Sequence, residues 1–132
     1  MSSGSLYIID THAWVEYFLG SKKGEKVRKL LENEKNVFAT IECCLAELRG
    51  WCLREEKDFD KFYRAVRANS TIIPVLLEHW LSAAEVKFQM RKTRKGFGLI
   101  DALLLVRQKE LKCHVVSGDP HFKDLPNIVF LQ

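Results

Sequence analysis

Four carboxylates stand at positions from which an acidic side chain can do chemistry. Asp10 and Asp119 each follow a short apolar run that is typical of a buried strand. Glu47 falls at the edge of the apolar face of a predicted helix, and Asp101 lies in the first turn of a helix built otherwise from Leu, Ile, Ala and Val. Oxygen ligands of this kind favour Mg²⁺ or Mn²⁺ over zinc, so the set indicates a divalent-cation site.

Three of these carboxylates also have a purely structural interpretation. Asp is a favoured N-cap, so Asp10 could simply begin a helix at Thr11. Asp119 lies in a Gly-Asp-Pro sequence, which is ordinary turn chemistry. A helix N-terminus stabilises an acid such as Asp101, although a helix start needs no such apolar flanks.

Glu47 is harder to explain as a surface charge. The nearby Glu42 has a potential ion-pair partner in Arg49, one heptad further on the same predicted helix. Glu47 has no such partner and projects close to the core. A carboxylate in that position needs a partner or a cation.

The elements that must position these residues follow from the hydrophobic periodicity. Pro74 marks an edge strand or a strand end. Helices separate nearly all the strands, which predicts an α/β domain with a mostly parallel sheet over residues 1–132, with 1–5 as a flexible end. The predicted strands cover residues 6–9, 37–39, 71–76, 113–117 and 128–131, and the predicted helices cover 11–19, 21–34, 41–54, 58–68, 78–93 and 99–106.

A parallel sheet brings the carboxyl ends of its strands, and the N-termini of the helices that follow, to one edge. If the strands before Asp10 and Asp119 are near neighbours, three or four carboxylates converge there and raise one another's pKa values. A divalent cation relieves the repulsion, activates water and stabilises a leaving oxygen, which is the chemistry of phosphodiester hydrolysis. A polyanion could be held by the basic run just upstream of Asp101, unless that run is only a solvated loop; it consists of Arg91, Lys92, Arg94 and Lys95.

Composition excludes several other classes. The 132-residue chain is 47% hydrophobic and 29% charged with a net charge of +4, as expected of one soluble globular domain. No apolar run approaches the roughly 20 residues that span a bilayer, and the start does not resemble a signal peptide. The four cysteines match no zinc spacing, which indicates inert thiols in a reducing, cytoplasmic compartment.

Taken together and in order, four motifs resemble the PIN-domain family, and within it the VapC-type toxins. This resemblance covers the whole chain and implies a Rossmann-like α/β/α sandwich with the activity of a Mg²⁺- or Mn²⁺-dependent endoribonuclease. It implies that Asp10, Glu47, Asp101 and Asp119 are the acidic quartet, and that Ser117 is the small hydroxyl residue near the fourth acid. The motifs are Tyr7-Ile8-Ile9-Asp10-Thr11, Leu45-Ala46-Glu47-Leu48, Ile100-Asp101-Ala102-Leu103-Leu104 and Val115-Val116-Ser117-Gly118-Asp119-Pro120-His121-Phe122.

The resemblance also carries expectations about neighbouring groups and partners. The family's Asp-Thr-Asn appears here as Asp10-Thr11-His12, where His12 either donates to a phosphate or packs at the helix start. Arg94 and Lys95 are candidates to hold the RNA backbone. The family implies a homodimer held inactive by a small antitoxin that inserts a basic side chain among the carboxylates. The aromatic residues of 58–68 are either part of that surface or, as we favour, ordinary core: Phe59, Phe62 and Tyr63.

Two alternatives within the same fold stay open. One is an RNA-processing nuclease that is not a toxin, and the other is a non-catalytic PIN-like module that binds RNA or protein. Enzymes from other folds fit poorly, because a haloacid-dehalogenase-like phosphatase needs an Asp where His12 stands, a receiver domain needs adjacent acids after the first strand, and a P-loop motif is missing.

Overall fold

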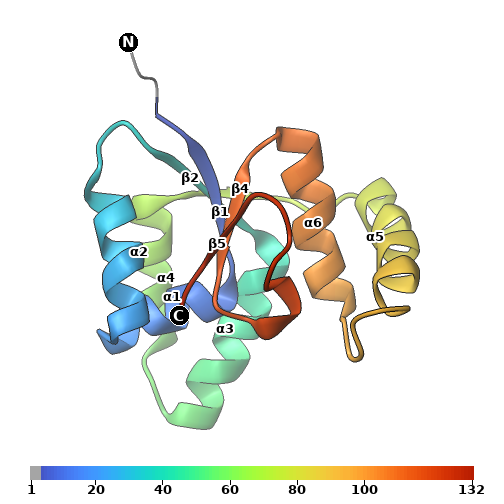
Figure 1. Ribbon diagram of the computed structural model, residues 1–132. Coiled ribbons are helices and arrows are strands. Elements are labelled where there is room, and N and C mark those ends of the chain that lie inside the picture. Colours follow the sequence, from blue (N-terminus) through green and yellow to red (C-terminus); the bar gives the residue numbers. More distant parts are fainter. Residues whose placement is uncertain (1–3) are drawn as a thin grey trace.

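The core of the protein is a five-stranded parallel sheet (Figure 1). The computed structural model describes residues 4–132. The strand order is β3-β2-β1-β4-β5, and every neighbouring pair is parallel. The predicted α/β class with a parallel sheet is therefore confirmed. The strands are β1 (Leu6–Ile9), β2 (Val37–Ile41), β3 (Thr71–Ile73), β4 (His114–Ser117) and β5 (Ile128–Phe130).

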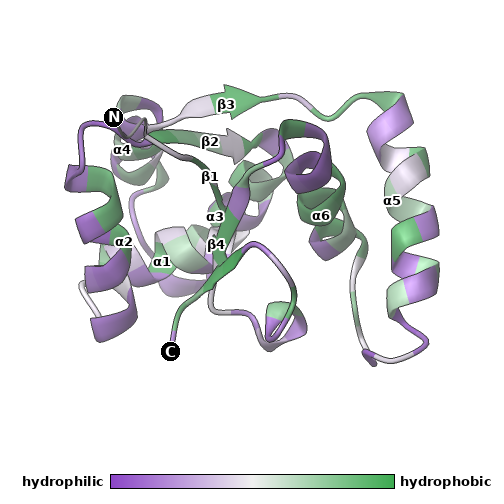
Figure 2. Ribbon diagram, turned by 45° about the horizontal axis from the view of Figure 1, so that its top comes forward, coloured by the Kyte–Doolittle hydropathy of each residue, from purple (hydrophilic) through white to green (hydrophobic). Residues whose placement is uncertain are grey.

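Helices cover both faces of this sheet. Successive residues of the central strand β1 point to opposite faces: Ile8 packs in a cluster with Leu103 of α6, whereas Ile9 packs in a cluster with Trp14 of α1. Figure 2 shows the mainly hydrophobic strands between these helical layers, with α2 mostly hydrophilic at the outside. The result is an α/β/α sandwich. The helices are α1 (Thr11–Leu19), α2 (Lys22–Glu32), α3 (Glu42–Glu55), α4 (Phe59–Asn69), α5 (Leu77–Met90) and α6 (Leu99–Leu111).

The chain changes direction across the sheet at β1. From β1 it moves to β2 and β3 on one side, and it then crosses to β4 and β5 on the other. Ile9 is aligned with Val116, and the Asp10 amide donates to the Val116 carbonyl at 3.2 Å. The expected neighbourhood of the strands before Asp10 and Asp119 is confirmed, and these residues lie at the topological switch point where α/β proteins bind ligands.

The connection from β4 to β5 contains no α-helix. Its one regular element is a short 3₁₀ helix, η1 (Pro120–Phe122), whose Phe122 is fully buried. Arg94 fixes this connection from outside, since its Nη1 donates to the carbonyls of His121 at 3.1 Å and Lys123 at 2.8 Å. The segment that carries Asp119 is thus tied to the loop before α6.

Several element boundaries differ from the sequence expectation. Helix α5 ends at Met90 and not at 93, β3 ends at Ile73 and not at 76, and larger differences occur at α3 and α6. Strand β2 continues through Ile41, so α3 begins at Glu42 and not at Ile41 as predicted. Thr40, expected to open that helix, lies in the strand because its hydroxyl is used elsewhere: it accepts from Trp14 Nε1 at 3.1 Å and pairs with Ser70 at 2.8 Å. Helix α6 runs five residues beyond the predicted end at Val106, to Leu111.

Two interactions predicted for α3 and α4 have different outcomes. The prediction of an ion pair between Glu42 and Arg49 is wrong. Glu42 instead accepts from the Val75 amide at 2.9 Å, and the Arg49 guanidinium lies 5.0 Å from the centre of the Phe59 ring. Phe59 and Phe62 pack against a buried cluster, as the core interpretation predicts. Tyr63, the third aromatic residue of that prediction, is half-buried and stacks on Phe59 with ring centres 5.5 Å apart.

The chain ends and the thiols complete the description. Of the end expected to be flexible, residues 1–3 lie outside the described part of the chain, while the Ser5 carbonyl accepts from the Val37 amide at 2.9 Å. Within residues 4–132 no helix is long and apolar enough to cross a membrane. All four cysteines are free thiols: Cys43, Cys44, Cys52 and Cys113.

Candidate metal centre

Asp10 is the most buried of the candidate acids, with 5% of its surface exposed. It is the N-cap of α1, and its Oδ1 accepts from the Ala13 amide at 2.9 Å. Burial raises the pKa of Asp10 from 3.8 to about 7, against the lowering effect of the Ser117 side chain and the Ala13 amide. The charges of Asp119 and Glu47 raise the pKa of Asp10 further. Asp10 therefore both caps α1 and lies among the other acids of the site.

Glu47 reaches the same edge from α3. The Thr11 hydroxyl donates to Glu47 Oε1 at 2.8 Å and lies 3.2 Å from the Cys44 carbonyl. Glu47 is an exposed residue, so the expectation that it projects close to the core is wrong. Partial loss of solvent around its carboxylate nevertheless raises the pKa of Glu47, and the charges of Asp101 and Asp119 add to this effect. Thr11 therefore fixes Glu47 and is itself fixed by the backbone of α3.

Asp101 lies in the first turn of α6, with 16% of its side chain exposed. Its Oδ2 accepts from the Gly98 amide at 2.9 Å, an interaction that also satisfies one free amide of the helix start. Burial raises the pKa of Asp101, and the Asp119 charge raises it further.

Asp119 follows β4 and caps η1, where its Oδ1 accepts from the His121 amide at 2.9 Å. The fully buried Ser117 hydroxyl accepts from the Asp119 amide at 3.0 Å. Ser117 thus lies between the two strand-end acids: it orients the Asp119 backbone, and its side chain lowers the pKa of Asp10. Ser117, which the resemblance indicated as the small hydroxyl residue of the site, therefore helps to organise the acids.

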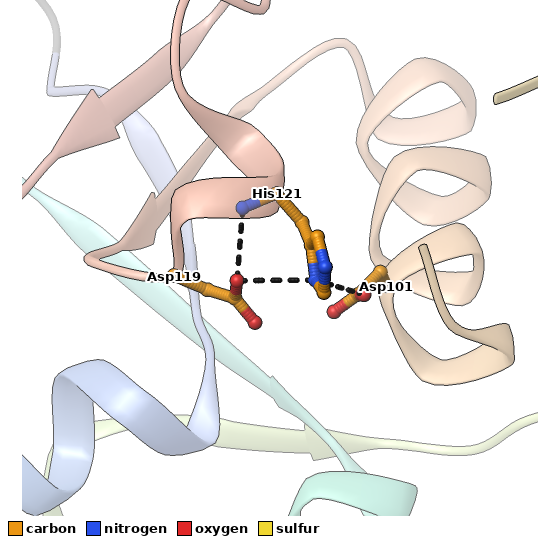
Figure 3. Close-up of side chains that lie close together, drawn as sticks. All are labelled: Asp101, Asp119 and His121. Atoms are coloured by element: carbon orange, nitrogen blue, oxygen red, sulfur yellow. Dashed lines mark hydrogen bonds and ion pairs between the residues drawn. The ribbon is translucent and has the colours of Figure 1, made fainter. Parts of the chain in front are cut away.

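The tightest cluster at this edge contains a residue that the sequence did not indicate. Asp101, Asp119 and His121 each offer one ligand atom, and these atoms all lie within 4.8 Å of one another. Figure 3 shows the His121 imidazole reaching from η1 towards Asp101 on α6, with Asp119 beside it. Asp10 and Glu47 lie outside this closest group, although their charges act on its members.

His121 was missed because a histidine in a Pro-His-Phe turn has no pattern of its own. The available signal was its position two residues after Asp119, at the edge where the acids were expected.

His12 packs at the start of α1, directly against the chain after β4. A Cβ atom at Gly118 would lie 2.5 Å from His12 Cε1, so only glycine fits at that position. His12 Nδ1 is buried and makes no hydrogen bond within residues 4–132. The packing interpretation of His12 is therefore supported by contacts, while donation to a phosphate stays a prediction.

The basic run before α6 divides into two kinds of residue. Arg94 holds the η1 segment, and Arg91 Nε donates to the Phe97 carbonyl at 2.7 Å, so both arginines stabilise loop backbone. Lys92 Nζ lies 5.1 Å from the centre of the Phe88 ring. Lys95 is exposed, and it is the candidate in this run whose charge is most available to a ligand.

The donor set fits a divalent cation. Each of the four acids is held at one oxygen by an amide or hydroxyl: Asp10 by Ala13, Glu47 by Thr11, Asp101 by Gly98 and Asp119 by His121. The second oxygen of each carboxylate, and the second lone pair of the bonded oxygen, are left to bind an ion. The buried His121 Nδ1 makes no hydrogen bond and faces the same group. The expected mutual repulsion is present, but burial is the larger cause of the raised pKa values of Asp10, Glu47 and Asp101.

An acidic cluster at the switch point of a parallel sheet defines an α/β protein with a candidate divalent-metal site. The model of the PIN-domain family matches residues 7–128, and the chain belongs to this family. A comparison with curated proteins found no match.

Several solved structures share this fold. The toxin VapC20 of Mycobacterium tuberculosis, described as cleaving the sarcin–ricin loop, is 14% identical with a TM-score of 0.75, over 96% of this chain and 99% of that one. VapBC2 of Rickettsia felis, bound to promoter DNA, is 18% identical with a TM-score of 0.70, over 95% and 96%. A toxin–antitoxin complex of Klebsiella pneumoniae is 16% identical with a TM-score of 0.64, over 93% and 95%.

Proposed function

We propose that this protein is a divalent-metal-dependent endoribonuclease and the toxin of a VapBC-type pair. The observation that carries the proposal is the cluster of acids at the switch point of a PIN-domain fold. The structural relatives support the toxin role, since one is described as a toxin that cleaves the sarcin–ricin loop, one as a toxin–antitoxin complex and one as VapBC2 bound to promoter DNA. A small antitoxin, a homodimer and a cytoplasmic location belong to the same proposal.

Asp10, Glu47, Asp101 and Asp119 would hold Mg²⁺ or Mn²⁺. A bound cation neutralises the phosphate, lowers the pKa of water and stabilises the leaving oxygen. The protein supplies the preorganised frame: the helix-capping contacts of Asp10 and Asp101 and the Thr11 hydroxyl on Glu47 fix the acids before substrate arrives. Lys95 and other exposed basic side chains would hold the RNA backbone, a contribution that weakens as salt rises.

The test is cleavage of a mixed RNA pool with Mg²⁺, with Mn²⁺ and with EDTA, by the native sequence and by Asp101→Asn. We expect cleavage only with metal, and a loss of at least about 100-fold in Asp101→Asn, because the substitution removes a ligand charge and leaves the Gly98 contact possible.

Glu110→Gln is the matched control, because it makes the same chemical change at the opposite end of the same helix. It should cleave at the native rate. RNA binding without cleavage under any metal condition would indicate the non-catalytic module. Cleavage of RNA that leaves growth unaffected on expression without an antitoxin would indicate a processing enzyme.

A further inference from the structure

His121 is placed as a ligand would be, and neither the sequence motifs nor the proposed function accounts for it. Its Nδ1 lies 3.1 Å from Asp101 Oδ2 and 3.2 Å from Asp119 Oδ1 (Figure 3). These two carboxylates come from α6 and from the segment after β4, so the imidazole joins two parts of the site.

The same nitrogen makes no hydrogen bond. His121 Nδ1 is buried from solvent and lacks a hydrogen-bond partner within residues 4–132, although both carboxylate oxygens are close. When the imidazole is protonated, these two oxygens are its ion-pair partners. In the neutral tautomer with a lone pair on Nδ1, this nitrogen faces two carboxylates and no donor, and a cation between the three groups would satisfy all of them.

Two of the three donor spacings match those of adjacent ligands around an octahedral ion. Adjacent ligands around a cation with bonds of about 2.1 Å lie about 3 Å apart. The two separations from His121 Nδ1, 3.1 and 3.2 Å, have this value, and all three ligand atoms lie within 4.8 Å of one another.

The ring is also held in place by surroundings that leave Nδ1 free. Phe97 packs edge-to-face against His121, with ring centres 5.9 Å apart. Gly96 also lies close to the ring: it has a φ of +80°, and a Cβ there would lie 3.4 Å from His121 Nε2. Arg94 binds the His121 carbonyl, so the backbone of this residue is fixed as well as its ring.

We propose that His121 Nδ1 is a metal ligand of this site, beside Asp101 and Asp119, and that it shifts the preference of the site from Mg²⁺ towards first-row transition ions such as Mn²⁺. The inference rests on the proposed function and specifies its cofactor. Mg²⁺ favours oxygen ligands, whereas transition ions bind imidazole nitrogen well, so one nitrogen donor strengthens their binding selectively.

The experiment measures metal binding directly on the full chain. Titration calorimetry gives the affinities for Mn²⁺ and Mg²⁺, and electron spin echo spectroscopy of bound Mn²⁺ detects a directly coordinated nitrogen. We expect nitrogen modulation in the native sequence and none in His121→Phe, which keeps an aromatic ring beside Phe97. The substitution should weaken Mn²⁺ binding at least about tenfold and change Mg²⁺ binding less than about threefold.

Two further variants make the result decisive. His12→Asn should keep the nitrogen signal, since His12 is the other imidazole with a buried, unbonded Nδ1 at this edge. His121→Asp, which supplies oxygen in place of nitrogen, should lose the signal and lower the ratio of Mn²⁺ to Mg²⁺ affinity at least about tenfold.

The failures are distinguishable. Metal-dependent RNA cleavage with no nitrogen coupling, or with coupling that survives in His121→Phe, overturns the role of His121 and leaves the nuclease intact. Absence of both metal binding and cleavage overturns the proposed function and this inference with it.

Discussion

The two ends of α6 each place a histidine beside a carboxylate, but only one end carries its own cation. At the C-terminal end, Glu110 pairs with Arg107, and His79 Nε2 lies 3.3 Å from the same carboxylate. His79 Nδ1 accepts from the Leu76 amide at 3.0 Å, so both ring nitrogens have partners. At the N-terminal end, Asp101 and Asp119 surround His121 Nδ1, and among residues 4–132 no lysine or arginine forms an ion pair with either acid.

The helix dipole does not explain this difference. A helix N-terminus favours an acid and a C-terminus favours a base, so Asp101 and Arg107 are both well placed. What differs is the balance of charge: one carboxylate with one arginine at one end, and several carboxylates without a permanent cation at the other. The C-terminal cluster has its own cation in Arg107, whereas the proposed function requires a cation from outside for the N-terminal cluster.

The largest predicted effect is a dependence of the free energy of unfolding on pH in the absence of metal. It comes from Asp10, whose carboxylate belongs to the acidic site at the N-terminal end of α6. The pKa of Asp10 is about 7 in the folded protein and 3.8 without the fold, so the folded state binds more protons between these values and stability falls as pH rises from about 4 to about 7. At about 1.4 kcal/mol per pKa unit, the full shift is worth roughly 4 kcal/mol.

Asp10→Asn keeps a capping side chain and removes this charge. In EDTA, denaturant unfolding should show the variant more stable than the native sequence above pH 7, by up to roughly 4 kcal/mol, and equally stable below pH 4. Glu47 and Asp101 also have raised pKa values, so a smaller slope of the same sign remains. Identical pH profiles for the two proteins would show that the Asp10 charge is not desolvated by folding.

Mn²⁺ should stabilise the folded protein through the acidic site at the N-terminal end of α6 and not through the cluster at its C-terminal end. Mn²⁺ at about 100 times its dissociation constant should raise the free energy of unfolding of the native sequence by about 2.7 kcal/mol, because the ion binds only the folded site. Glu110→Gln should gain the same amount, and Asp101→Asn should gain little. Thermal unfolding with and without Mn²⁺ at pH 7 measures this, and equal stabilisation of both variants would place the ion elsewhere.

The sequence predicted the parts of the site that depend on strand order. Asp10 and Asp119 follow apolar runs, and in a parallel sheet their position at one edge follows from that order alone. Glu47 was singled out by its place on the helix, but its contact with the Thr11 hydroxyl depends on how α1 and α3 pack. His121 and Arg94 could not be assigned, because a 3₁₀ turn directs the imidazole and Arg94 binds carbonyls 27 and 29 residues away in the chain.

Arg94 provides a test of that long-range contact. Arg94→Met removes the guanidinium that donates to the carbonyls of His121 and Lys123, and it should lower the free energy of unfolding by about 1.5 to 3 kcal/mol, since a hydrogen bond from a charged group contributes about this much. It should also weaken Mn²⁺ binding, because the η1 segment loses its anchor. Lys95→Met is the control: as an exposed residue it should change stability by less than about 0.5 kcal/mol and affect RNA binding only. The opposite pattern would make Arg94 an RNA contact.

The smallest expected effect is that of Glu110→Gln on stability. The Glu110 side chain is 48% exposed, so much of the Arg107 interaction is screened by water, and the amide can still accept from that arginine. Urea unfolding should show a loss of less than about 1 kcal/mol, with no dependence on Mn²⁺. The reason is that Arg107 supplies a permanent charge at this end whatever the solution contains. A loss of several kcal/mol would mean that this cluster is held as far from water as the acids at the other end of α6, and the contrast between the two ends would then lie in their donors and not in their need for an external ion.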